Sequence, residues 1–316
     1  MARTVRSSMS AQIAIIGTGT IGASWATHYL ARGFDVVATD PAPGAEAALR
    51  SYVDAAWDAA STLGVVPGAS RDRLRFTADL REAVADAVFV QENAPERPQL
   101  KVKLLAEIDD AAPVESIIAS SSSAITMSVM QAECRRPERT VIGHPFNPPH
   151  VIPLVEVVGG ERTAPETIER AMVFYASIGK KPVRLRKELP GHVANRLQAA
   201  LYREVVHLID QGVLGVADAD DAVSWGPGLR WGVMGPSLLW HLGGGEGGIQ
   251  HFMDTLMGPM AAMWPALGNP QVTPELEHKI VEGVVAEANG RSIDDLAAER
   301  DAMLIALEGV RARYQP

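Results

Sequence analysis

Short runs of β-branched and aliphatic residues alternate with longer amphipathic segments over the first 190 residues. The runs have the length of buried strands, and the segments between them are long enough for helices. We expect strands at 13–16, 35–39, 87–91, 116–119, 140–143, 154–158 and 183–186, and helices at 20–32, 45–63, 99–110, 125–133 and 165–178. Strands that alternate with helices predict an α/β fold with a Rossmann-type, doubly wound and mostly parallel sheet.

The pattern changes after the polar and Pro/Gly-containing segment 187–191. From there on the apolar positions recur at helical spacing, which predicts helices at 195–211, 218–224, 236–241, 248–264, 274–288 and 293–313. A chain of 316 residues is long enough for two separate cores. We therefore expect an α/β domain at 1–190 and an all-helical domain at 191–316.

The charge balance excludes several classes of partner. The chain has 29 Lys and Arg against 38 Asp and Glu, a formal net charge of −9. This acidic balance argues against binding to nucleic acid or to an anionic membrane surface. No stretch approaches the roughly 18 uninterrupted apolar residues of a membrane span. We expect a small-molecule substrate, with neither a nucleic acid nor a membrane as partner.

The single cysteine and the N-terminus bear on location. Cys134 cannot form an internal disulfide, and no Cys/His pair stands near it at metal-ligand spacing, so we expect a cytoplasmic protein without a metal. Arg3 and Arg6 precede the apolar run 13–16 as in a signal peptide, but Gly17 interrupts that run. We interpret residues 1–11 as a short tail, with Met9 as an alternative start.

A glycine-rich turn joins the first predicted strand to the first predicted helix. Its residues Gly17, Gly19 and Gly22 form Gly-x-Gly-x-x-Gly, in which the glycines permit a tight turn, backbone approach to a pyrophosphate and close helix packing. With Thr20 and Ile21 they open a helix whose free N–H groups attract phosphate. The alternative is a glycine-rich turn that binds nothing.

Asp40 ends the second predicted strand, 18 residues after Gly22. A carboxylate at this position accepts hydrogen bonds from the adenosine ribose hydroxyls and repels the 2′-phosphate of NADP. The sequence therefore predicts NAD as the cofactor.

Four blocks of sequence give the chain a family resemblance. They are residues 17–22, 120–125, 144–148 with 155–157, and 190–197, and the intervals between them match as well. By these blocks the chain resembles the 3-hydroxyacyl-CoA dehydrogenase family over essentially its whole length. Carried over by position, the resemblance implies that Ser123, His144, Glu156 and Asn195 are the catalytic residues. It also implies that the helical domain at 191–316 binds substrate and mediates dimerisation, so that the protein is a homodimer.

The chemistry of these residue types agrees with that assignment. Oxidation of a secondary alcohol needs a base for the hydroxyl proton, and a histidine can accept and return a proton near neutrality. A carboxylate within the apolar strand of Glu156 would be costly unless it pairs with His144 and fixes the histidine tautomer. Ser123 and Asn195 could hold the reacting oxygen, one from each domain.

Each of these four residues also has a structural interpretation. His144 could be an ordinary strand-end histidine, Glu156 could point to solvent, Ser123 could lie in a plain loop, and Asn195 could cap a helix. The four together, at matching intervals, favour catalysis.

Further segments indicate a branch of the family. Residues 90–97 and 226–236 resemble the branch with L-carnitine dehydrogenase and L-gulonate 3-dehydrogenase, and residues 244–248 and 290–296 resemble carnitine dehydrogenases most. The resemblance implies that a small free 3-hydroxy acid is oxidised to the 3-oxo acid. The alternatives are L-3-hydroxybutyryl-CoA dehydrogenase and a non-catalytic, crystallin-like NAD-binding protein.

Candidate residues for the substrate and for the nicotinamide side follow from this branch. Arg230 could clamp a free carboxylate by bidentate pairing, although a surface or interface arginine is an equal alternative. Asn147, in a His-Pro-Phe-Asn-Pro segment, is a further substrate candidate. By the resemblance, Glu92 stands where the family has a carboxylate near the nicotinamide ribose. The alternative is a residue at the end of a strand that caps the next helix. A cation–π cage is a weaker hypothesis, since tryptophans are more often core or interface residues; its candidates are Trp225, Trp231, Trp240 and Trp264.

Overall fold

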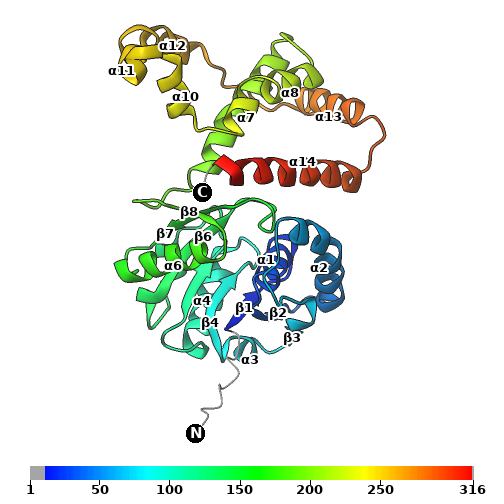
Figure 1. Cartoon of the computed structure of the whole chain (residues 1–316), viewed down its shortest axis with the longest axis vertical. Coiled ribbons are helices and arrows are strands. Elements are labelled where there is room, and N and C mark those ends of the chain that lie inside the picture. The colour runs from blue at the N-terminus through cyan, green and yellow to red at the C-terminus, as the bar shows by residue number, and fades with distance from the viewer. Residues whose placement is uncertain (1–10, 315–316) are drawn as a thin grey trace. The chain divides into compact units, whose positions relative to one another are not determined.

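A computed structural model describes residues 11–314 (Figure 1). The chain forms two compact units, of which the first ends at Ala194 and the second begins at Asn195. The predicted tail, including Met9, lies outside the described residues except for Ala11. No helix within 11–314 combines the length and the apolar character needed to cross a membrane.

The first unit is built on one eight-stranded sheet with the strand order β3-β2-β1-β4-β5-β6-β7-β8. Its strands are β1 (Gln12–Ile16), β2 (Asp35–Thr39), β3 (Leu74–Phe76), β4 (Ala87–Glu92), β5 (Ile117–Ser120), β6 (Thr140–Pro145), β7 (Leu154–Val158) and β8 (Lys181–Arg184). All neighbouring strands run parallel except β6 and β7, which are antiparallel. The predicted mostly parallel, doubly wound sheet is confirmed. Its order reverses between β1 and β4, and ligands of such sheets bind at this switch point.

Helices cover both faces of the sheet, and a separate apolar core fills each interface. They are α1 (Thr20–Ala31), α2 (Ala45–Thr62), α3 (Leu80–Val84), α4 (Pro98–Ala111), α5 (Met127–Met130) and α6 (Pro165–Ser177). One core joins α1, α2 and α6 to strand residues such as Ile13 and Ile15. The other joins α3, α4 and α5 to the alternate residues Ala14 and Ile16. Since both faces of the sheet are buried, the strand sequences are continuous apolar runs.

The structure corrects several boundaries. The strand β3 and the helix α3 were not predicted, because three and five residues are too short for a periodic signal. The last strand, expected at 183–186, lies two residues earlier at the exposed sheet edge. The helix expected at 125–133 is regular only in α5.

The second unit is helical, as predicted. Its helices are α7 (Ala194–Asp210), which starts at the last residue of the first unit, then α8 (Val216–Ser224), α9 (Pro227–Trp231), α10 (Pro236–Gly243), α11 (Gly248–Thr255), α12 (Met257–Met263), α13 (Pro274–Ala288) and α14 (Ile293–Tyr314). The single helix expected at 248–264 is two helices, because Pro259 lacks the N–H that a continuous helix would need. The buried core is small and consists of Val205, Val206, Ile209, Ala219 and Leu276.

Candidate active site

The glycine-rich turn at the end of β1 has the shape of a phosphate cradle. Gly17 adopts a φ of 85°, and a Cβ there would lie 2.9 Å from the Asn93 carbonyl oxygen. A Cβ on Gly22 would lie 1.9 Å from the Gly17 carbonyl oxygen, so α1 can approach the turn only with glycine here. A Cβ on Gly19 would meet nothing within 4 Å among the described residues. Thr20 and Ile21 then form the first turn of α1, whose N–H groups suit a phosphate.

Asp40 follows β2 beside this turn. The Thr18 backbone N–H donates to Asp40 Oδ2 at 2.7 Å, and the Ala42 N–H donates to Oδ1 at 2.9 Å. These contacts fix the carboxylate, which stays partly exposed. The open cradle and the adjacent oriented acid are the groups that the pyrophosphate and the adenosine ribose of NAD require.

His144 and Glu156 form a buried pair on adjacent strands. They face each other in the antiparallel register of β6 and β7, where cross-strand neighbours share one face. His144 Nδ1 lies 3.0 Å from Glu156 Oε2, and the side chains are only 5% and 2% exposed. Glu156 therefore does not point to solvent, and that alternative is wrong.

The second oxygen of Glu156 is also satisfied. Oε1 accepts the backbone N–H groups of Val193 at 2.8 Å and Ala194 at 3.0 Å. Burial alone would raise the pKa of Glu156, but the hydrogen bonds from His144 and from these two N–H groups hold it below its usual value. An ionised carboxylate only accepts, so Nδ1 of His144 carries a proton, and in the neutral ring Nε2 presents a lone pair.

That lone pair points at Ser123. Ser123 Oγ lies 3.0 Å from His144 Nε2, which completes a Ser123–His144–Glu156 array within the first unit. The geometry brings together three of the four predicted catalytic residues. Such an array can take a proton from a hydroxyl and return it.

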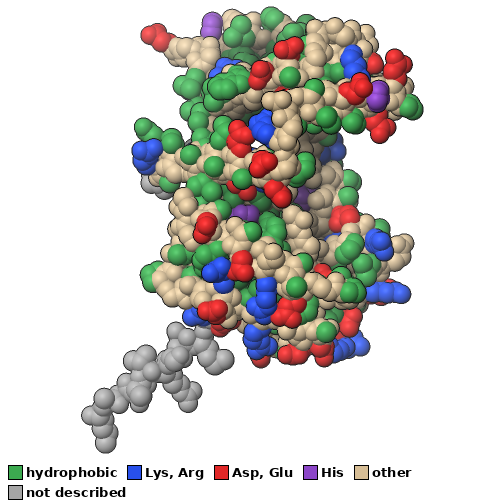
Figure 2. All heavy atoms as spheres, turned by 90° about the vertical axis from the view of Figure 1, so that its right-hand side faces the viewer, with side chains coloured by type: hydrophobic (Ala, Val, Ile, Leu, Met, Phe, Trp, Pro, Cys, Tyr) green, Lys and Arg blue, Asp and Glu red, His purple; other side chains and the backbone are tan. Residues whose placement is uncertain are grey.

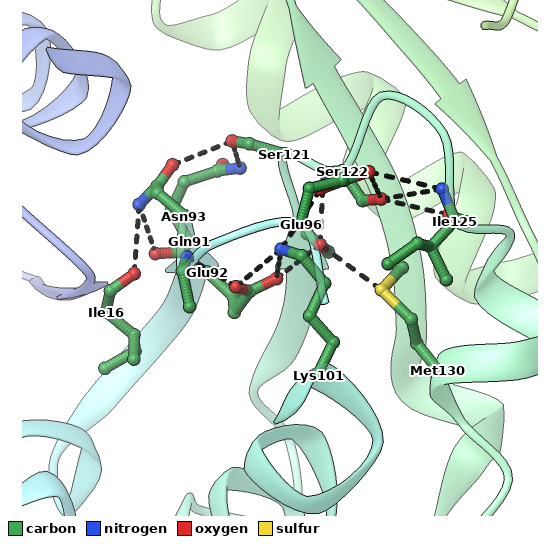
Figure 3. A network of polar contacts seen from close by, with 12 residues as sticks. Ile16, Gln91, Glu92, Asn93, Glu96, Lys101, Ser121, Ser122, Ile125 and Met130 are labelled. Atoms are coloured by element: carbon green, nitrogen blue, oxygen red, sulfur yellow. Dashed lines mark hydrogen bonds and ion pairs between the residues drawn. The ribbon is translucent and has the colours of Figure 1, made fainter. Parts of the chain in front are cut away.

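Polar contacts hold the serine turn, as Figure 3 shows. Glu96 accepts from Ser122 Oγ and from the backbone N–H groups of Ala124 at 2.8 Å and Ile125 at 3.2 Å. These contacts lower the pKa of Glu96, although burial acts in the opposite direction. The turn that carries Ser123 is thereby anchored from the segment that precedes α4.

A second set of contacts ties the serine turn to the glycine turn. Gln91 Nε2 donates to Ser121 Oγ at 2.9 Å, and that hydroxyl donates to Asn93 Oδ1 at 2.8 Å (Figure 3). Asn93 also bonds the carbonyl of Ile16, the last residue of β1. The glycine turn and the serine turn thus share one set of hydrogen bonds.

Glu92 has a different environment from the one its predicted role needs. It is fully buried, and its carboxylate accepts from Lys101 Nζ at 2.8 and 3.0 Å, from Ser120 Oγ and from the Ala94 N–H. Its contact with a cofactor stays a prediction. Sequence reasoning missed Glu96, whose side chain is 37% exposed and which lies 3.7 Å from the same lysine. The available signal was a second acid four residues after Glu92, between the predicted strand and the predicted helix.

The remaining predicted residues are placed by their element and their exposure. Asn147 is exposed in the loop between β6 and β7. Asn195 is half-buried in the first turn of α7 and follows Ala194 directly in the chain. Arg230 is exposed on α9 and makes no ion pair with any described residue.

The four tryptophans of the second unit are not core residues. Trp225, Trp231, Trp240 and Trp264 are 74%, 42%, 37% and 56% exposed. Trp240 stacks on Phe252 with 4.8 Å between ring centroids. Across residues 11–314 no three His, Cys, Asp or Glu side chains gather as a metal site would require.

Two family models match the chain. Residues 12–189 match the model described as 3-hydroxyacyl-CoA dehydrogenase, NAD binding domain, and residues 191–286 match 3-hydroxyacyl-CoA dehydrogenase, C-terminal domain. The two models together cover most of the chain.

Similar proteins and a similar structure extend the comparison. The chain is 51% identical to an L-carnitine dehydrogenase of Streptomyces griseus over 93% of this chain and 88% of that protein. It is 46% identical to an L-carnitine dehydrogenase of Bacillus cereus over 96% and 94%. A crystal structure of 5-formyl-3-hydroxy-2-methylpyridine 4-carboxylic acid 5-dehydrogenase, an NAD+-dependent dismutase, matches with a TM-score of 0.82 and 36% identity, over 96% of this chain and 99% of that one.

Proposed function

The chain belongs to the 3-hydroxyacyl-CoA dehydrogenase family and is an NAD-dependent dehydrogenase acting on the CH–OH group of a 3-hydroxy acid, and from this premise we propose that its substrate is L-carnitine. L-Carnitine is a free 3-hydroxy acid with a trimethylammonium group, and its oxidation would give the 3-oxo acid and NADH. The similarity to L-carnitine dehydrogenases over nearly the whole chain carries this proposal.

We propose that His144 is the base. Bound NAD supplies the hydride acceptor. The Nε2 lone pair of His144 takes the hydroxyl proton, and the Glu156 carboxylate at 3.0 Å stabilises the imidazolium that results. Ser123 holds the reacting oxygen by a hydrogen bond, since its hydroxyl lies beside the same nitrogen. Asn195 assists from the helical unit.

The cofactor contacts follow the turn geometry. Gly17, Gly19 and Gly22, with Thr20 and Ile21, would hold the pyrophosphate, and Asp40 would hold the adenosine ribose. On the nicotinamide side, Glu96 is a better candidate than Glu92 for contact with the cofactor, because Glu92 is fully buried and paired with Lys101.

We propose that Arg230 and Asn147 bind the substrate carboxylate. The exposed guanidinium of Arg230 without an ion-pair partner in the described chain supports this role, because bidentate pairing suits a carboxylate. The exposed tryptophans could receive the trimethylammonium group by cation–π contact.

We propose that the protein is a homodimer through its helical unit. Figure 2 shows hydrophobic side chains over that unit's surface, and monomeric proteins rarely expose large apolar areas. The exposed set includes Leu229, Val233, Leu238, Leu242, Met253, Leu256 and Met263. Sedimentation equilibrium would test this, and a monomer at micromolar concentration would contradict it.

A cytoplasmic location completes the proposal. Its support is the single cysteine, Cys134, which is buried and unpaired as is usual in a reducing compartment.

NADH production from a substrate panel tests the function. The panel is L-carnitine, L-gulonate, L-3-hydroxybutyrate and L-3-hydroxybutyryl-CoA, each with NAD and with NADP. We expect L-carnitine to give the highest kcat/KM, and Arg230→Met to raise KM for it. Preferred turnover of the CoA thioester would reject the free-acid proposal, and preferred turnover of gulonate would reject carnitine alone.

A further inference from the structure

The segment 191–194 contacts both sides of the Ser123–His144–Glu156 array. The Gly191 N–H donates to the Ser123 carbonyl at 3.0 Å. The N–H groups of Val193 and Ala194 donate to Glu156 Oε1. His192 stands between these contacts, and its Nε2 lies 2.9 Å from the Ser122 carbonyl oxygen. We call residues 191–194 the clasp, because they join the serine turn to the carboxylate.

The contact of His192 fixes its tautomer. A carbonyl oxygen can only accept, so Nε2 carries the proton and donates to Ser122. Nδ1 then holds a lone pair, and this atom is buried without a hydrogen-bond partner in the described chain. A second proton would create an N–H group with no acceptor, inside a side chain that is only 3% exposed.

The electrostatic surroundings of His192 act in both directions. Its ring centroid lies 4.8 Å from that of His144, so two charged rings would repel each other. Burial is the largest influence and lowers the pKa of His192, and His144 lowers it further. The Ser122 carbonyl, Glu156 and Glu96 oppose this shift, but the net direction is downward.

The backbone adds a separate observation. His192 has a φ of 48° and follows Gly191 at 78°, so two successive residues occupy the left-handed region. A non-glycine residue there costs on the order of 1 kcal/mol or more, and glycine would avoid this cost. The side chain of His192 compensates through its contacts with the serine turn.

We propose that His192 is a neutral positioning residue: its Nε2–H holds the Ser122 carbonyl, and with it the Ser123 hydroxyl, in place against His144. Its uncharged ring leaves His144 as the histidine that takes the proton of the substrate. This role rests on the proposed functions of Ser123 and His144.

Two variants of equal length test the donor. His192→Gln keeps an N–H donor near the position of Nε2, whereas His192→Met has the same chain length and no donor, and both carry the same backbone strain. We expect His192→Met to lower kcat about 10- to 100-fold, the order expected when a catalytic group is misplaced by about 1 Å. KM and the Kd for NADH should stay within about twofold of wild type. His192→Gln should restore most of kcat. Equal losses in both variants, or a His192→Met enzyme with wild-type kcat, would overturn the proposal.

Histidine ¹⁵N spectra of the wild-type protein give a measurement that does not depend on the variants folding. We expect His192 to be the Nε2–H tautomer and to have a pKa below the ordinary histidine value of about 6.5. A His192 ring that titrates at or above the ordinary value, or one that carries its proton on Nδ1, would refute the proposal. His144→Ala is assayed in parallel: if it keeps turnover, the proposed base is wrong, whereas the tautomer of His192 is read independently.

Discussion

Replacing Glu156 by glutamine removes one charge from the buried array and changes little else. The carboxylate is 2% exposed, so solvent screens its interaction with His144 weakly. At about 4 Å and an effective dielectric constant of about 20, two unit charges interact by about 4 kcal/mol. Loss of that stabilisation from an imidazolium formed in the transition state corresponds to about a 10³-fold lower kcat.

The hydrogen bonds predict a loss in the same direction. The amide oxygen of glutamine would accept from the Val193 and Ala194 N–H groups, which leaves the NH2 group facing His144 Nδ1. Nδ1 must then accept, so the proton moves to Nε2 and the base loses its lone pair toward Ser123. The variant therefore has the wrong tautomer as well as the missing charge.

Steady-state NADH production measures this effect, and NADH titration checks that the cofactor site is intact. We expect kcat to fall about 10³-fold while the Kd for NADH changes little. Glu166→Gln, at an exposed position on α6, is the matched control and should behave as wild type. A Glu156→Gln enzyme within about tenfold of wild-type kcat would refute the proposed pairing.

Three further predictions concern the first unit. Asp40→Asn should raise the Kd for NADH about 10- to 100-fold, since hydrogen bonds to charged groups contribute about 1.5–3 kcal/mol. It should also reduce the preference of the protein for NADH over NADPH, and fluorescence titration with both cofactors measures the two effects. Lys101→Met leaves the fully buried Glu92 without its cation and should cost about 3–5 kcal/mol of unfolding free energy, measured by urea denaturation, with Lys101→Met/Glu92→Gln recovering part of the loss. Burial lowers the pKa of His28 in the folded protein well below its usual value. As the pH falls, His28 is therefore protonated in the unfolded chain before it is protonated in the folded chain, so the free energy of unfolding should decrease below about pH 6.5, by up to about 1.4 kcal/mol per pH unit. Urea denaturation midpoints measured at several pH values should depend less on pH in His28→Gln than in the wild type.

The sequence predicts features that depend on periodicity or on local turn chemistry. The glycines at 17, 19 and 22 and the acid at 40 occupy fixed places in one strand–turn–helix unit, so their roles can be inferred without tertiary contacts. The β2 strand and the α13 helix have the predicted bounds for a similar reason, since turn or capping residues flank both.

Features set by distant partners could not be predicted. Glu92 ends β4 and Glu96 follows in the connection to α4, but the ion pair with Lys101 on α4 makes Glu92 a core residue. The hydrogen bond between His192 Nε2 and the Ser122 carbonyl joins residues 70 positions apart. Neither residue belongs to a periodic pattern of apolar positions that would indicate the contact. The exposure of the tryptophans in the helical unit likewise depends on packing that composition does not encode.

The antiparallel pairing of β6 with β7 explains why His144 and Glu156 meet. A parallel crossover after β6 would insert a helix and send the next strand back in the same direction. Here the chain returns directly as β7, so the register sets position 144 opposite position 156, and both side chains share one face. The strand β7 also pairs in parallel with β8. The clasp follows β8 in the chain, and its Val193 N–H donates to Glu156 Oε1. A loop in place of a crossover helix therefore sets His144 opposite Glu156, and the backbone N–H groups of the clasp satisfy the second oxygen of that carboxylate.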